Sequence, residues 1–121
     1  NNHSCPTSIS QYAGIEALKG PQEELKKIVN EFQKRKEFLY TEINKLNNIS
    51  CFNPGGAFYA FPNISKTGLN GKEFSDLALE EKGVALVPGT SFGDKADMFV
   101  RISFANSIEK ISEAIKRIET I

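Results

Sequence analysis

The chain has 121 residues, of which 40% are hydrophobic and 25% charged, enough apolar material for the core of one modest domain. Its fifteen basic residues balance its fifteen acidic residues, so no net charge favours binding to nucleic acid or to an anionic membrane. The sequence shows no apolar stretch of membrane-spanning length and no signal-peptide pattern, so we expect a globular protein with no nucleic-acid or membrane partner.

Two helices are predicted in the first third of the chain. Ser8 is predicted to cap the first, over residues 9–18, where apolar side chains recur at helical spacing. The second is predicted over residues 21–46, with one turn, residues 34–36, missing from its apolar stripe. Such a helix is longer than a compact domain of this size needs. It either passes from one packing surface to another or is an amphipathic helix with one solvated turn.

Short strands and two more helices are predicted further along. Residues 49–52 and 57–61 surround a Pro-Gly-Gly turn and predict a β-hairpin. Asn70 is predicted to cap a helix over residues 72–82, with Phe74, Leu77 and Ala78 on its inner face. The apolar run at residues 84–87 predicts another strand, which a Pro-Gly pair ends.

The last predicted elements are a strand over residues 99–105 and a helix that Asn106 caps, with Glu109 completing a capping box. The order of elements favours an α/β (α+β) fold. We expect a two-layer sandwich of a small mixed sheet with helices on one face, preceded by a long interdomain helix.

One charged residue interrupts the apolar strand at residues 99–105. Arg101 cannot lose its charge, so a partly buried guanidinium there needs an anionic partner. That partner is either a surface carboxylate, for which Asp94 and Asp97 are candidates, or a bound ligand. From the residues alone, the prediction goes no further than an anion-binding arginine.

The cysteines, the histidine and a glycine-rich stretch indicate no further functional site. Cys5 and Cys51 lack the close pairing of a metal or redox site, and His3 is the only histidine, so we expect no metal site. We expect both thiols to be reduced, as in a cytoplasmic protein, with Cys51 in the core. The glycine-rich stretch at residues 89–93 lacks the Lys-Ser/Thr ending of a phosphate-binding loop and is read as a tight turn.

Three blocks of sequence, with an N-terminal stretch before them, resemble the C-terminal part of class I aminotransferases, most closely the bacterial-type aspartate aminotransferases. The blocks are Pro-Gly-Gly-Ala-Phe-Tyr-Ala-Phe-Pro at 54–62, Gly-Val-Ala-Leu-Val-Pro-Gly at 83–89 with Phe-Gly at 92–93, and Val-Arg-Ile-Ser-Phe-Ala at 100–105. The N-terminal stretch is Pro-Thr-Ser-Ile-Ser-Gln-Tyr-Ala at 6–13. The resemblance covers essentially the whole chain, and the order and spacing of the blocks match.

The resemblance implies a pyridoxal 5'-phosphate (PLP) enzyme of fold type I that works as a homodimer on amino-acid and 2-oxo-acid substrates. It implies that Arg101 binds the substrate α-carboxylate and that Phe58 lies near the substrate. It assigns residues 1–30 to the end of the large domain and the start of the interdomain helix, and residues 31–121 to the small C-terminal domain. The cofactor lysine belongs to family motifs upstream of Asn1, so we expect no catalytic residue in this chain and no activity from it alone.

Two functions from different classes stay open at this point. The chain is either part of an aminotransferase, with aspartate, aromatic, alanine or kynurenine-type substrates not separable here, or a non-catalytic α/β binding or assembly module. We expect the chain to be part of a longer polypeptide, and the sequence upstream of Asn1 discriminates between the two functions.

Overall fold

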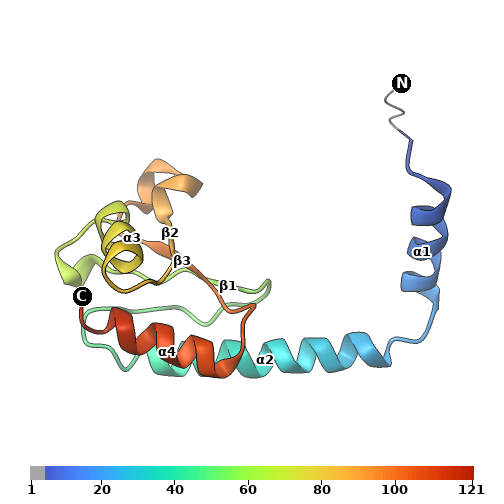
Figure 1. Cartoon of the computed structure of the whole chain (residues 1–121), viewed down its shortest axis with the longest axis horizontal. Coiled ribbons are helices and arrows are strands. Elements are labelled where there is room, and N and C mark those ends of the chain that lie inside the picture. The colour runs from blue at the N-terminus through green and yellow to red at the C-terminus, as the bar shows by residue number, and fades with distance from the viewer. Residues whose placement is uncertain (1–4) are drawn as a thin grey trace. The chain divides into compact units, whose positions relative to one another are not determined.

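The computed structural model describes residues 5–121. These residues divide into two compact units, with the boundary between Asn30 and Glu31. The helices are α1 (Ser8–Lys19), α2 (Glu23–Ile43), α3 (Gly71–Glu80) and α4 (Ile108–Ile118) (Figure 1). The strands are β1 (Tyr59–Ala60), β2 (Val87–Pro88) and β3 (Val100–Ser103). Helix α2 contains the boundary between the units.

The first unit consists of α1 and the first part of α2. The structure caps α1 with Thr7 rather than with Ser8, because the Thr7 hydroxyl accepts the backbone N–H of Ser10. No residue of α1 is buried. Its large apolar side chains are more than half exposed, as are those of the first part of α2: Ile9, Tyr12, Ile15, Leu18, Leu25, Ile28 and Val29.

Helix α2 ends at Ile43, three residues before the predicted end. The side chain of Asn44 accepts the backbone N–H of Cys51 at 2.9 Å and donates to its carbonyl at 3.0 Å. The same amide nitrogen donates to the carbonyl of Tyr40 at 2.8 Å, so it also satisfies the end of the helix. Because Asn44 fixes a segment seven residues away, the chain turns here rather than continuing as a helix.

The three strands form one sheet in the order β1-β3-β2, and both pairings are antiparallel, where a mixed sheet was expected. Tyr59 lies opposite Ser103, and Val87 lies opposite Arg101. Pairing continues past Pro62, which has no N–H, to a bridge between Asn63 and Phe99.

The predicted hairpin is wrong. The segment at residues 57–61 pairs with β3, some forty residues later, and residues 49–52 keep only an isolated bridge between Ser50 and Asn63. The predicted strand at residues 84–87 is likewise reduced to β2, which starts at Val87.

The two faces of the sheet differ sharply because side chains alternate along a strand. Ala60 and Val100 are 3% and 1% exposed and belong to the core, with which Ile102 also packs. Their neighbours Tyr59 and Arg101 point to the opposite face and are only partly buried. Since the helices pack on the core face, the predicted two-layer architecture is confirmed.

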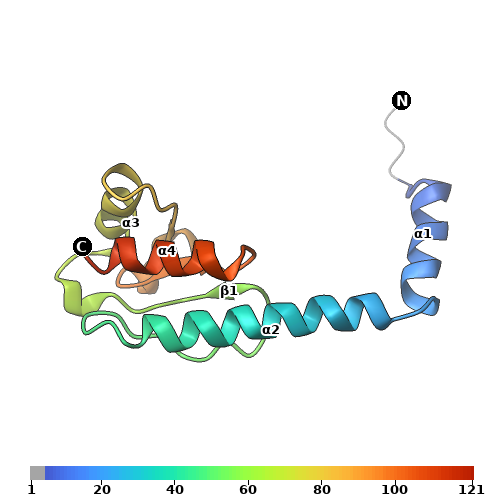
Figure 2. The same cartoon turned by 60° about the horizontal axis from the view of Figure 1, so that its bottom comes forward.

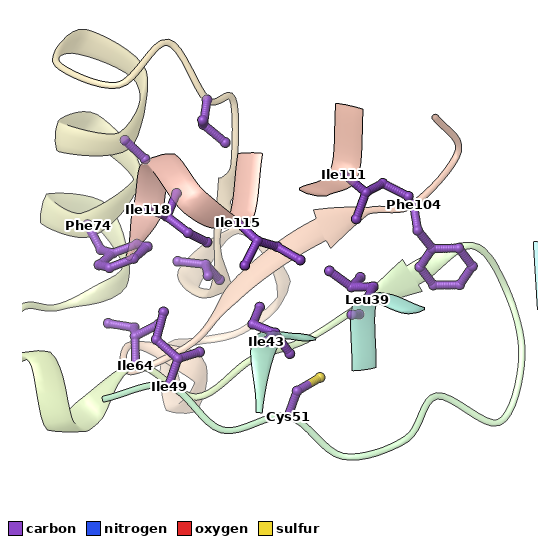
Figure 3. Packing of buried hydrophobic residues seen from close by; sticks show 14 residues of the cluster. Leu39, Ile43, Ile49, Cys51, Ile64, Phe74, Phe104, Ile111, Ile115 and Ile118 are labelled. Carbon is purple, nitrogen blue, oxygen red and sulfur yellow. The ribbon is translucent and has the colours of Figure 1, made fainter. Parts of the chain in front are cut away.

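Three helices contribute to this core (Figure 3). Figure 2 shows α4 running alongside the second half of α2. The buried side chains are Leu39 and Ile43 from α2, Phe74 and Ala78 from α3, and Ile111, Ile115 and Ile118 from α4. Within each helix these residues are three or four positions apart, a spacing that places them on one face.

The cap of α3 agrees with the prediction from the sequence, and the cap of α4 does not. Asn70 caps α3 as predicted, and Glu73 returns a bond to its backbone, which forms a complete capping box. In α4 the cap is Ser107, whose hydroxyl accepts the backbone N–H of Lys110 at 3.4 Å. The predicted capping box of Asn106 and Glu109 is therefore wrong by one residue.

Candidate functional site

Arg101 lies in the middle of the central strand β3, between a residue of β2 and a residue of β1. Its register partner on β2 is Val87. On the other side it is the diagonal neighbour of Tyr59, which pairs with Ser103 two residues further along β3. Diagonal neighbours in an antiparallel sheet are within reach of long and aromatic side chains.

Two aromatic rings cover the Arg101 guanidinium. Its central carbon Cζ lies 4.2 Å from the centroid of the Tyr59 ring and 4.6 Å from the centroid of the Phe92 ring. Phe92 ends a short 3-10 helix, Gly89–Phe92, that directly follows β2. Stacking of this kind is attractive because a cation sits over the negative face of each ring.

The loop that carries Phe92 is fixed by close backbone packing at Gly89. The N–H of Gly89 donates to the carbonyl of Phe99 at 2.8 Å. A Cβ atom at Gly89 would lie 2.1 Å from the carbonyl oxygen of Ala96 and 2.7 Å from that of Phe99. Only glycine permits this approach, so the tight turn predicted at residues 89–93 is packed against the segment that leads into β3.

Arg101 pairs with no protein carboxylate in the described part of the chain. Within residues 5–121 no carboxylate oxygen lies within 4.0 Å of its guanidinium. Asp94 and Asp97, the candidates from the sequence, are exposed and form no ion pair with it there. Within residues 5–121 the guanidinium N–H groups therefore have no carboxylate acceptor.

Phe58 directly precedes β1, and its ring contacts Tyr59, one of the two rings beside Arg101. Its ring lies 4.3 Å from that of Tyr59 and 6.2 Å from that of Phe32, centroid to centroid. It is 43% exposed.

Tyr59 and Phe92 were not identified from the sequence. Strand alternation indicates Tyr59 once the pairing of β1 with β3 is known, whereas no local signal indicates Phe92.

No lysine in the described part of the chain has an environment that fits a PLP site. A lysine that holds this cofactor must be withdrawn from water to present a neutral amine. No lysine within residues 5–121 is buried, and Lys27, Lys45, Lys72 and Lys110 are tied to carboxylates on their own helices. In the same part of the chain no cluster of three metal-ligating side chains occurs, and no helix is long and apolar enough to cross a membrane.

Cys51 is buried and Cys5 is exposed. Burial raises the pKa of the Cys51 thiol, with a smaller opposing effect from the backbone of Phe61. A separate cavity of about 360 Å³ lies along α4, and its lining includes Val84, Ile102 and Ile111 but not Arg101. Neither feature belongs to the arginine site.

Comparison with known proteins places this geometry in a family. The model of the family "Aminotransferase class I and II" matches residues 1–118. The chain belongs to the class I and II aminotransferases. The three sequence blocks therefore lie in an aminotransferase fold, and the resemblance inferred from them is confirmed.

Relatives with different substrates in their names match this aminotransferase chain about equally well. An aspartate aminotransferase of Pyrococcus horikoshii is 43% identical over 117 residues, which cover 93% of this chain and 29% of that protein. An aromatic-amino-acid aminotransferase of Thermococcus litoralis is 37% identical, over 99% of this chain and 31% of that protein. The crystal structure of an aromatic aminotransferase from Pyrococcus horikoshii superimposes with a TM-score of 0.90 at 39% identity, covering 96% of this chain and 31% of that one.

The chain thus spans about three-tenths of the length of these aminotransferases. The names of the relatives do not separate aspartate from aromatic substrates.

Proposed function

We propose that this chain is the C-terminal, substrate-binding part of a PLP-dependent aminotransferase and that Arg101 binds the α-carboxylate of the amino acid and of the 2-oxo acid. The observation that supports the assignment of Arg101 is its environment. It is a partly buried cation that lies over two aromatic rings, with no carboxylate partner within residues 5–121. An arginine that has cation–π partners but no counter-ion is suited to receive a ligand anion.

A carboxylate matches the N–H donors of the Arg101 guanidinium. The guanidinium is planar and presents its N–H groups along its edges, so it can form two parallel charge-assisted hydrogen bonds to one carboxylate. Every amino acid and every 2-oxo acid carries this group, whatever its side chain. Arg101 would therefore bind both substrates of a transamination without selecting between side chains.

The cofactor belongs to the remainder of the enzyme. The family implies PLP in the full-length protein, and the lysines described here do not form a site for it. We propose that residues 1–30 end the large domain, that residues 31–121 form the small domain, and that the chain alone is inactive.

The remaining assignments come from the family resemblance. The full-length enzyme is a cytoplasmic homodimer that acts on aspartate, and Phe58, half-exposed beside Tyr59, lies at the edge of the substrate site. Aromatic, alanine or kynurenine-type substrates are the alternatives within the family.

A non-catalytic module is the alternative in a different class. The coding sequence upstream of Asn1 separates the two: a cofactor lysine in a large domain supports the aminotransferase, and a start codon directly before Asn1 contradicts it.

Substitution of Arg101 in the full-length enzyme tests its role. Arg101→Lys keeps the charge but loses the two-bond geometry. Since one charge-assisted hydrogen bond contributes about 1.5 to 3 kcal/mol, kcat/KM should fall roughly ten- to over a hundred-fold for every amino acid alike. Arg101→Ala should cost more, with little change in melting temperature. Full activity with a lowered melting temperature would make Arg101 a structural residue instead.

A further inference from the structure

We infer that Tyr59 and Phe92 are positioning residues for anion binding: they hold the Arg101 guanidinium in one plane, so that its N–H edge faces the carboxylate. The inference rests on the proposed function of Arg101. It goes beyond that function by naming two residues that act through the arginine without touching the substrate carboxylate themselves.

The first support is that the rings lie over the guanidinium. Both centroids are within 4.6 Å of Cζ, and one ring comes from strand β1 while the other comes from the loop after β2. Two rings at this distance restrict the movement of the guanidinium. Within residues 5–121 no hydrogen bond joins the guanidinium to either residue, so its N–H donors remain available to a carboxylate.

The second support is that each ring is braced by another ring. The Phe58 ring lies 4.3 Å from Tyr59. The Phe61 ring meets Phe92 edge-on, at 5.9 Å and 80°, and itself stacks on Phe99 at 5.3 Å and 10°. Because the rings are held from behind, the guanidinium lies against supported surfaces rather than against free side chains.

The third support is the lack of any other restraint. Within residues 5–121 the Arg101 side chain forms no ion pair and no hydrogen bond to another side chain. An arginine side chain loses rotamer entropy when it is fixed. Because the rings already restrict the side chain before the ligand binds, less entropy is lost on binding, and the affinity for the carboxylate is higher. The effect should therefore appear in KM and leave kcat nearly unchanged.

The test uses steady-state kinetics of the full-length holoenzyme, with whichever of aspartate, alanine or phenylalanine the wild type turns over fastest. Tyr59→Leu and Phe92→Leu remove one ring each, whereas Tyr59→Phe and Phe92→Tyr retain the ring. Phe52→Leu, at a side chain that is 93% exposed, serves as the control for a general effect of losing a phenylalanine. Each ring substitution is also made in an Arg101→Ala background, and thermal melts accompany all variants.

We expect each leucine variant to raise KM roughly 3- to 10-fold with kcat within about 2-fold, and the ring-retaining variants to restore KM. In the Arg101→Ala background the leucine substitutions should raise KM no further. The inference is overturned if they raise KM equally in both backgrounds, or if they leave KM unchanged while Arg101→Ala raises it. If Arg101→Ala itself leaves KM unchanged, the proposed function fails, and the inference fails with it.

Discussion

Replacing Gly89 by alanine should destabilise the fold strongly, because the added methyl group meets backbone rather than flexible side chain. Its Cβ would lie 2.1 Å from the carbonyl oxygen of Ala96, 2.7 Å from that of Phe99 and 3.0 Å from the Phe99 Cβ. Relief requires the loop to move by about 1 Å, which also stretches the hydrogen bond from Gly89 to Phe99. Overpacking costs about 1 to 3 kcal/mol and the lost bond about 0.5 to 1.5 kcal/mol. The expected loss is about 1.5 to 4.5 kcal/mol in the free energy of unfolding.

The chain offers a matched control at Gly55. A Cβ there would have no heavy atom within 4 Å, and its backbone is not left-handed, so Gly55→Ala should be neutral or stabilising by up to about 1 kcal/mol. Urea denaturation followed by far-UV circular dichroism measures both variants. Equal free energies of unfolding for Gly89→Ala and Gly55→Ala would refute the reasoning.

Gly71 extends the same test, because it presses on the same carbonyl from α3. Its Cβ would lie 2.3 Å from the Phe99 oxygen and 2.9 Å from the Asp97 oxygen. Gly71→Ala should therefore also destabilise, and the double variant should lose less than the sum of the two single losses, since one displacement of the Phe99 carbonyl relieves part of both clashes.

Two further predictions concern stability. Asn70→Ala removes the side chain that accepts the N–H groups of Lys72 and Glu73, so urea denaturation should show a loss of about 1 kcal/mol, whereas Asn53→Ala, outside any helix, should show almost none. Burial raises the pKa of Cys51, so the unfolded chain ionises this thiol at lower pH than the folded chain does, and stability should fall as pH rises above the ordinary thiol value of about 8.5. Cys51→Ala should remove that part of the alkaline loss in urea titrations at several pH values, and an identical alkaline slope in this variant would contradict the assignment.

Local signals predicted the helices better than the sheet. The apolar stripe and the Asn70 cap of α3 lie within one stretch of sequence, and both were predicted. The end of α2 was missed because the Asn44 side chain binds the backbone of Cys51, a competition that helical periodicity does not reveal. The hairpin was wrong because β1 pairs with β3, and a contact over some forty residues leaves no local pattern.

The candidate site divides in the same way. Arg101 was identified from the sequence because a charge within an apolar strand demands a partner. The two rings over it were not identified. Tyr59 reaches the guanidinium diagonally across the pairing of β1 with β3, which had not been predicted. Phe92 reaches it from a loop whose position depends on the contact of Gly89 with the Phe99 carbonyl.

The central claim, that Arg101 binds the substrate α-carboxylate, is tested most directly by removing the carboxylate as well as the arginine. The full-length enzyme and its Arg101→Ala variant are each assayed with an amino acid and with the primary amine that lacks only its α-carboxylate. If the claim holds, Arg101→Ala lowers kcat/KM for the amino acid by about 100-fold or more and leaves the value for the amine within about 2-fold. An equal loss for the amino acid and the amine would contradict it.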